Sequence, residues 1–380
     1  MERQGGGAET VSARFLAPLG AGAVEDGAVV MEAGRVAWAG PRAKLPSGSP
    51  PVRDLGDGIL LPVPINAHCH LEFPRPPEPL ARGDGFAAWA RRVLAWEIPP
   101  SVRRETASRH AHDLARGGTG AVLDHAESGG PEVLVSAGLG GFSFREIRGI
   151  APTFPDGDSR APVAPHTPHT LLAADLFRAG SSLGPVSIHL AESEEEMGLY
   201  RGDRNDLAEL LIERGFPQSH LDDLAASRSP VRRLERAGLL TPRLACVHCV
   251  HLEEDDLRRL AAKGCTIVLS PRSNEAIGVG RADLATMRRL GMRVCLGTDS
   301  LASAPDLEVR NDALALGGID ALEAWNILTL HPGRYLETNG LVGWGRIAKG
   351  SHAPVFYPTP GARTVEEAAQ TALAAEAIRI

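Results

Sequence analysis

The sequence predicts an α/β protein: a (β/α)₈ TIM barrel with a small β-sandwich domain formed by both chain ends. The first observation is a set of ionisable residues that each follow a short apolar run: His68 and His70, His189, His248 and Asp299. A residue at the end of a buried strand is held rigidly and still projects into a cleft, where rigid metal sites are built. Strand ends that converge in this way are typical of a barrel.

The second observation is that apolar runs alternate with amphipathic helical patterns along the chain. The expected barrel strands are residues 59–65, 120–123, 141–146, 161–164, 185–188, 244–247, 265–269 and 293–296. Helical patterns lie between several of them, at residues 86–96, 103–115, 206–214 and 253–262. Eight strands with intervening helices make a barrel of about 250 residues, which matches the segment from about 60 to 335.

The two chain ends lie outside this barrel segment. Residues 10–55 and 341–357 both contain short β-rich runs, with glycine turns in the first of them. We expect the two ends to pair into one small β domain. The predicted boundaries are residues 1–58 for the first part of the β-sandwich, 59–338 for the catalytic barrel, and 339–380 for the second part and a C-terminal tail.

Composition limits the classes of partner. The 380 residues include 40 basic and 47 acidic side chains, a net charge of −7, without a long block of like charge. We therefore expect a small-molecule substrate and neither a nucleic acid nor a membrane as partner. The absence of an apolar run of about 20 residues and of a signal peptide predicts a cytoplasmic protein. The odd number of cysteines, five, argues against a disulfide framework, and a homodimer is left open.

The spacing of the histidines predicts a metal site. His68 and His70 are two positions apart on an extended segment, so both imidazoles point the same way. His189 and Asp299 follow the fifth and eighth expected strands. Three neutral nitrogens and one carboxylate suit one divalent transition metal, and leave a coordination position for water. We expect zinc, with iron(II) as the alternative.

Two further residues are candidates for proton transfer. Glu192 lies three residues after His189, in the turn above the strand, where a carboxylate near the metal can move a proton between water and substrate. The alternative is that the acidic run from 192 to 196 only caps the next helix, which we favour for Glu194 to Glu196. His248 ends its own strand and can orient the attacking water or bind a second metal.

These motifs resemble the amidohydrolase superfamily, within it the branch of cytosine, S-adenosylhomocysteine and aminodeoxyfutalosine deaminases and related chlorohydrolases. The resemblance spans residues 55 to 350 and rests on the motifs at 66–72, 164–166, 189–193, 248–252, 270–274 and 297–300. It implies that one metal is bound by His68, His70, His189 and Asp299, that Glu192, His248 and Asp299 are catalytic, and that His166 contacts the substrate. Glu72, at the end of the first motif, is a further candidate for substrate binding.

The resemblance also indicates a reaction. Segments 270–274 and 298–303 look most like those of the aminodeoxyfutalosine deaminases of the alternative menaquinone route, which release ammonia from an adenine nucleoside that carries a benzoate. Arg145, Arg148 and Arg272 follow strand ends and are candidates for binding that carboxylate. The alternatives are a cytosine, guanine or triazine aminohydrolase or a chlorohydrolase of the same branch, and a metal-binding barrel without catalytic activity.

Lysine usage argues against a second bridged metal. Binuclear members of the superfamily use a carboxylated lysine from the middle of the barrel as the bridge. The lysines of this chain are Lys44, Lys263 and Lys349. Since none lies between His70 and His189, that bridge cannot form, and Glu146 is the alternative bridging residue.

A second zinc-deaminase signature, in which cysteines hold the metal, is matched only superficially. His125 and Glu127 stand for its first half, and Cys246 and Cys249 for its second half. The proline expected before the first cysteine is missing, and roughly 120 residues separate the halves. We therefore reject this signature.

Two positions depart from the family pattern. His169, in the loop after His166, stands where many relatives have an aromatic residue. The substrate specificity of this wall of the expected site is therefore left open. Pro354 replaces an acid near the C-terminus. Neither residue is among the expected metal ligands.

Overall fold

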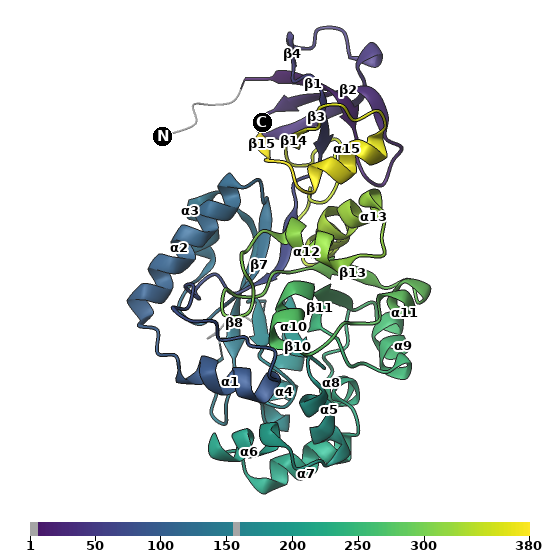
Figure 1. Cartoon of the computed structure of the whole chain (residues 1–380). Coiled ribbons are helices and arrows are strands. Elements are labelled where there is room, and N and C mark those ends of the chain that lie inside the picture. The colour runs from purple at the N-terminus through teal and green to yellow at the C-terminus, as the bar shows by residue number, and fades with distance from the viewer. Residues whose placement is uncertain (1–6, 155–159) are drawn as a thin grey trace. The chain divides into compact units, whose positions relative to one another are not determined.

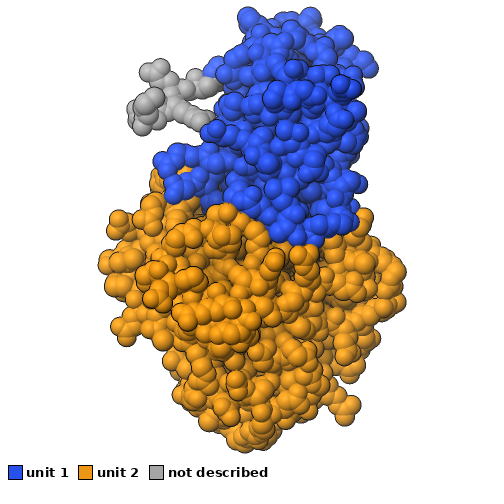
Figure 2. Space-filling model, in the orientation of Figure 1, with its two compact units in different colours: residues 1–66, 113–121, 308–380 blue, residues 67–112, 122–307 orange. Residues whose placement is uncertain are grey.

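The computed structural model describes residues 7–154 and 160–380 (Figure 1). The chain forms two compact units (Figure 2). One comprises the chain up to Asn66 together with Asp113–Ala121 and Glu308–Ile380, and the other comprises Ala67–His112 and Val122–Leu307. The domain boundaries expected at residues 58 and 338 rest on the order of the expected strands along the chain, and they stay a prediction.

The predicted barrel is present. Within the described residues, eight parallel strands form one sheet in sequence order. They are β6 (Ile65–Cys69), β7 (Ala121–Ala126), β8 (Gly140–Ile147), β9 (Val163–Pro165), β10 (Val186–Leu190), β11 (Leu244–His248), β12 (Thr266–Leu269) and β13 (Arg293–Leu296). The first and last strands meet where the backbone N–H of Thr298 donates to the carbonyl oxygen of His68 at 2.9 Å. The strand ends therefore face a common centre.

Helices follow most of the strands. They are α1 (Phe86–Ala95), α2 (Pro100–Arg116), α3 (Pro131–Ala137), α4 (Ala173–Gly180), α5 (Glu194–Arg201), α6 (Asp206–Glu213), α7 (Gln218–Ser227), α8 (Pro230–Arg236), α9 (Glu254–Ala262), α10 (Pro271–Ile277), α11 (Leu284–Arg289), α12 (Val309–Leu316), α13 (Ala321–Trp325), the π-helical turn η2 (Asn326–Leu330) and α14 (His331–Thr338). Several begin at a side-chain cap, for example Ser193 before α5 and Asn205 before α6. In the part of the chain that is described, no helix is long and apolar enough to cross a membrane.

The two chain ends pair, as predicted. Hydrogen bonds join β1 (Glu9–Leu16), β2 (Val24–Glu32), β3 (Arg35–Pro41), β4 (Val52–Asp54), β5 (Gly58–Leu61), β14 (Val355–Pro358) and β15 (Ile378–Arg379) into one sheet. A 3₁₀ turn, η1 (Arg42–Lys44), follows β3, and α15 (Val365–Ala372) lies between β14 and β15. In Figure 1 the yellow C-terminal strands lie beside the purple N-terminal ones. In the order β15, β14, β5, β1, β2, β3, the C-terminal strand β14 pairs directly with the N-terminal strand β5.

One strand assignment from the sequence was wrong. The run 59–65 was expected to be the first barrel strand, but it is divided: β5 belongs to the sheet of the chain ends, and β6 begins only at Ile65. Pro62 and Pro64 explain the division, because proline lacks the N–H that a central strand donates to its neighbour. As a result His68 lies within the strand β6, rather than after it.

Gly297 allows the barrel to close. A Cβ atom at this position would lie 2.5 Å from the Cβ of His68 and 2.7 Å from its backbone nitrogen. We expect Gly297→Ala to lower the free energy of unfolding by about 1–3 kcal/mol, the usual cost of overpacking, as measured by denaturant unfolding. Gly22→Ala is the matched control, since its Cβ would meet no atom within 4 Å. Equal stability of the two variants would contradict this prediction.

Candidate active site

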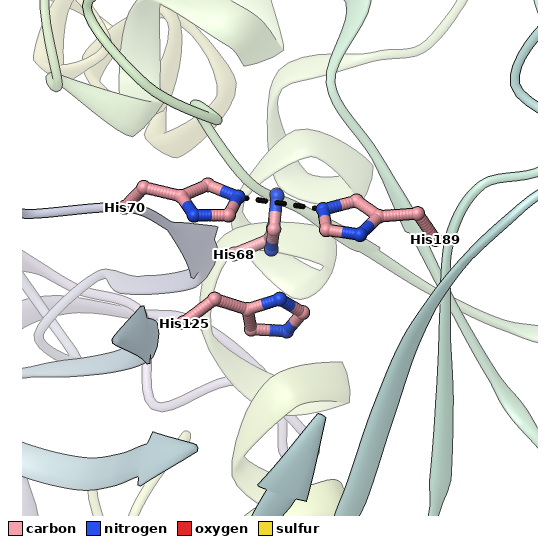
Figure 3. Close-up of side chains that lie close together, drawn as sticks. All are labelled: His68, His70, His125 and His189. Atoms are coloured by element: carbon pink, nitrogen blue, oxygen red, sulfur yellow. Dashed lines mark hydrogen bonds between the residues drawn. The ribbon is translucent and has the colours of Figure 1, made fainter. Parts of the chain in front are cut away.

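The three expected histidine ligands converge at the end of the barrel strands (Figure 3), and Asp299 lies beside them. His68 and His70 come from β6 and its end, His189 from β10, and Asp299 follows β13. The Nε2 atoms of His68 and His70 each lie 3.6 Å from Asp299 Oδ1. His70 Nε2 lies 3.4 Å from His189 Nε2. Donor atoms at these separations can share one ion, since metal–ligand distances are about 2.0–2.2 Å.

Neighbouring groups orient these donors. His189 Nδ1 donates to the carbonyl oxygen of His166 at 2.8 Å, so its Nε2 carries the lone pair that faces the site. Ser273 and Ser303 donate to Asp299 Oδ2 at 2.7 and 2.8 Å, which leaves Oδ1 toward the histidines. Burial lowers the pKa of His68 to about 4. His68 therefore offers a neutral imidazole, the form that binds a transition metal.

The backbone at these strand ends is strained. Ala191, His248, Cys249 and Asp299 have positive φ angles of 49°, 70°, 50° and 61°, which non-glycine residues rarely adopt. Backbone hydrogen bonds between strand ends hold them: the N–H of Cys249 donates to Leu190 at 2.9 Å and the N–H of Asp299 to His68 at 3.2 Å. Such strain persists where the surrounding structure imposes it, and it concentrates at functional sites.

Glu192 and His248, the two residues expected to transfer protons, lie next to each other in this site. Glu192 is 5% exposed, and its Oε2 lies 3.7 Å from His248 Nε2. Burial, followed by the negative charge of Asp299, raises the pKa of Glu192 well above its usual range. His248 Nδ1 donates to Asn274 Oδ1 at 2.9 Å, so Nε2 is the nitrogen that accepts a proton. A protonated carboxyl next to a basic nitrogen can both donate and accept protons during catalysis.

The neighbouring acids do not share this role. The Glu196 carboxylate accepts hydrogen bonds from the backbone N–H groups of Ala191 and Glu192, both at 3.0 Å. The backbone N–H of Glu196 donates in turn to Ser193 Oγ, the N-cap of α5. Glu194 is exposed in the first turn of the same helix. Glu196 thus fixes the turn that places Glu192 over the site.

A cavity of about 420 Å³ opens next to the donor set. Its residues include His70, His166, His189, Glu192, His248 and Asp299 on one side. Apolar side chains of α1 and α6 and their neighbours complete it: Phe73, Phe86, Trp89, Val93, Leu94, Ile150, Leu207, Leu210, Leu211 and Phe216. The expected metal ligands and catalytic residues therefore line the same cavity as a largely apolar wall.

The predicted substrate-binding residues are divided. His166 and Arg148 line the cavity, whereas Glu72 and Arg145 are not among its lining residues. Arg145 donates to the carbonyl oxygen of Glu127 at 2.6 Å. Arg148 lines the cavity but forms an ion pair with the Glu127 carboxylate. Their roles in substrate binding stay a prediction.

Glu72 has structural partners. Its carboxylate pairs with Arg103 at 2.9 Å and accepts the backbone N–H groups of Glu127 and Ser128 at 3.2 and 2.9 Å. It is 2% exposed. A buried carboxylate needs such partners, so these contacts account for the acid at this position. Arg272 likewise pairs with Asp306 at 2.9 Å.

Two residues of this region are not among the site residues expected from the sequence. His125, in β7, lies in contact with His68 (Figure 3), and Arg214 lines the cavity. His125 comes near the end of an apolar run, as the other site histidines do, so the same rule predicts it. It is also part of the rejected cysteine signature. In the described residues, cysteines are absent from every group that could hold a metal.

Comparison with known proteins agrees with the resemblance. Residues 205–353 match the model of the amidohydrolase family. This match spans three of the motifs that carry the resemblance, those at residues 248–252, 270–274 and 297–300.

Two relatives of this chain are named as deaminases. The chain is 29% identical to an aminodeoxyfutalosine deaminase of Deinococcus radiodurans, over 77% of this chain and 76% of the relative. It is 28% identical to a 5-methylthioadenosine/S-adenosylhomocysteine deaminase of Symbiobacterium thermophilum, over 79% of this chain and 70% of the relative.

Solved structures share the fold. The aminofutalosine deaminase of Helicobacter pylori in complex with methylthio-coformycin aligns with a TM-score of 0.78 at 18% identity, over 96% of each chain. An adenosine deaminase of Xanthomonas campestris with bound zinc aligns with a TM-score of 0.74 at 22% identity, over 97% of this chain and 89% of that one. At these identities the likeness establishes the fold.

Proposed function

We propose that the protein is a metal-dependent hydrolase that removes the amino group of an adenine nucleoside as ammonia. The observation that carries this proposal is the buried Glu192 and His248 pair, which lies beside the donor set at one side of the cavity. The names of the relatives support the same reaction. A barrel that only bound a metal would have no use for this pair.

The residues divide the reaction between them. A bound transition metal would supply a water molecule whose pKa is lowered toward about 7. The protonated Glu192 donates its proton to a ring nitrogen of the substrate, which makes the adjacent carbon electrophilic. His248 Nε2 and Asp299 hold the water as its oxygen adds to that carbon. Asp299 takes up one of the water protons and passes it to the amino group, and the other water proton restores Glu192. The bond to the amino group then breaks, and ammonia leaves.

Zinc is the first candidate for the metal and iron(II) the second. His68, His70, His189 and Asp299 offer nitrogen and oxygen donors that suit both ions. The zinc bound in the Xanthomonas campestris adenosine deaminase supports the first choice.

The cavity indicates what the rest of the substrate carries. Its wall beyond the catalytic pair is apolar, with a cation at Arg214. Among the described residues, Arg214 has no ion-pair or hydrogen-bond partner for its side chain, whereas Arg148 is paired with Glu127. An adenine nucleoside with an aromatic, anionic extension on its 5′ side, such as aminodeoxyfutalosine, would match both features. We therefore place its carboxylate at Arg214, with Arg148 as the second candidate.

We expect Arg214→Met to lower kcat/KM for the carboxylated nucleoside by roughly 10- to 150-fold, because a charge-assisted hydrogen bond contributes about 1.5–3 kcal/mol. Its activity on adenosine should not change. Steady-state kinetics on the two substrates measure this difference. Arg232→Met is the matched control, since Arg232 is exposed and does not line the cavity. An equal loss on both substrates would contradict a role in binding the carboxylate.

Ammonia release from a panel of substrates, with chloride release measured for the chlorinated triazine, tests the proposed function itself. The panel contains adenosine, 5′-methylthioadenosine, S-adenosylhomocysteine, aminodeoxyfutalosine, cytosine, guanine and a chlorinated triazine. We expect adenine nucleosides to react fastest. Faster turnover of cytosine, guanine or the triazine would replace the proposed substrate by that alternative, and no release from any compound by metal-loaded protein would support a barrel without catalytic activity.

A further inference from the structure

His125 is a buried histidine to which the proposed reaction gives no role. It lies in β7 and is 1% exposed. Across residues 7–154 and 160–380, neither of its ring nitrogens has a hydrogen-bond partner. An unsatisfied buried polar group destabilises the folded protein, so a histidine that served only to fill the barrel would be less favourable there than an apolar residue. Its nitrogens therefore need a partner.

The surroundings of His125 indicate what that partner is. The centre of its ring lies 4.6 Å from that of His68, 5.3 Å from that of His70 and 5.0 Å from that of His189. Each of these four histidines offers a nitrogen, and the four nitrogens all lie within 4.8 Å of one another. Figure 3 shows His125 on one side of the group, with its ring next to His68.

We propose that His125 is a fifth protein ligand of the metal, in addition to His68, His70, His189 and Asp299. Two nitrogens on one ion lie at most about 4.2 Å apart, twice the metal–nitrogen distance, so shifts of roughly half an ångström suffice. Five protein ligands and one water complete an octahedral shell, whereas zinc most often takes four ligands. The ion favoured by this shell is a divalent transition metal that accepts six ligands, such as iron(II) or cobalt(II).

The proposal rests on the metal site of the proposed function and is independent of the substrate. Its test uses cobalt(II), loaded into metal-depleted wild type and into His125→Phe, with affinity measured by chelator competition and the visible absorption spectrum recorded. We expect His125→Phe to bind cobalt(II) at least about 100-fold more weakly, beyond the usual cost of losing a group that only orients a ligand. Its absorption should change as the coordination number falls.

His220→Phe is the matched control, because His220 is also buried but its Nε2 donates to the carbonyl oxygen of His169 at 2.8 Å. It should bind cobalt(II) like wild type. The same affinity and spectrum in His125→Phe and wild type would overturn the fifth ligand and leave the proposed function intact. Wild type that binds no transition metal would overturn both.

X-ray absorption of the metal-loaded wild type tests the same point without any variant. Four imidazole ligands support the proposal, and three overturn it. This measurement decides the question even where His125→Phe does not fold.

Discussion

Glu192→Gln is expected to retain the metal and to lose deaminase activity by about 10²-fold or more, the usual scale of general acid–base catalysis. Glutamine keeps the shape of the side chain but has no proton of the required acidity. In the wild type, burial raises the pKa of Glu192, so the carboxyl stays protonated to a higher pH than an exposed glutamate would. Activity should therefore fall as pH rises through that raised pKa, and kcat measured against pH follows it.

Glu194→Gln is the matched control for this variant. Glu194 lies two residues away in the first turn of α5, where its side chain is 64% exposed. The change removes an acid from the helix N-terminus without touching the cavity, so activity should stay near that of wild type. If Glu192→Gln behaved like Glu194→Gln, the acidic run would serve only to cap the helix.

The barrel could be predicted because its strands are short apolar runs that end in ionisable residues. The exception, the run 59–65, failed for a local reason: Pro62 and Pro64 interrupt the hydrogen bonding, and the two halves pair in different sheets. Apolar character alone cannot say which sheet a strand joins. Of the helices between β10 and β11, only α6 was predicted, because its buried residues Leu207, Ala208, Leu210 and Leu211 follow the helical period. The helices α5, α7 and α8 contain fewer apolar residues.

In the candidate site, position at a strand end carried most of the information. His68, His70, His189 and Asp299 lie together because each is fixed by its strand. The same argument fails for long side chains such as Arg145, whose guanidinium donates to Glu127 and is not part of the cavity lining. Arg214 could not be predicted in this way, because it follows the helix α6 and does not lie at the end of a strand.

Removal of the metal is the second change with a large expected effect. We expect dialysis against a strong chelator to lower activity by about 10³-fold or more, because a catalytic metal contributes several kcal/mol and each 1.36 kcal/mol changes the rate tenfold. Addition of zinc or iron(II) should restore it. Elemental analysis before treatment should find about one transition-metal ion per chain, as in catalytic sites that keep one position open.

The number of ions discriminates between two arrangements of the same residues. Glu146 and His166 place their ligand atoms within 4.8 Å of that of His189, so these two residues would hold a second ion beside the first, bridged by Glu146. Two tightly held ions per chain would favour that binuclear site over the mononuclear one. With one ion, His166 stays free to contact the substrate in the cavity that it lines. Glu146→Gln should then leave the metal content unchanged, whereas in a binuclear site it would halve it.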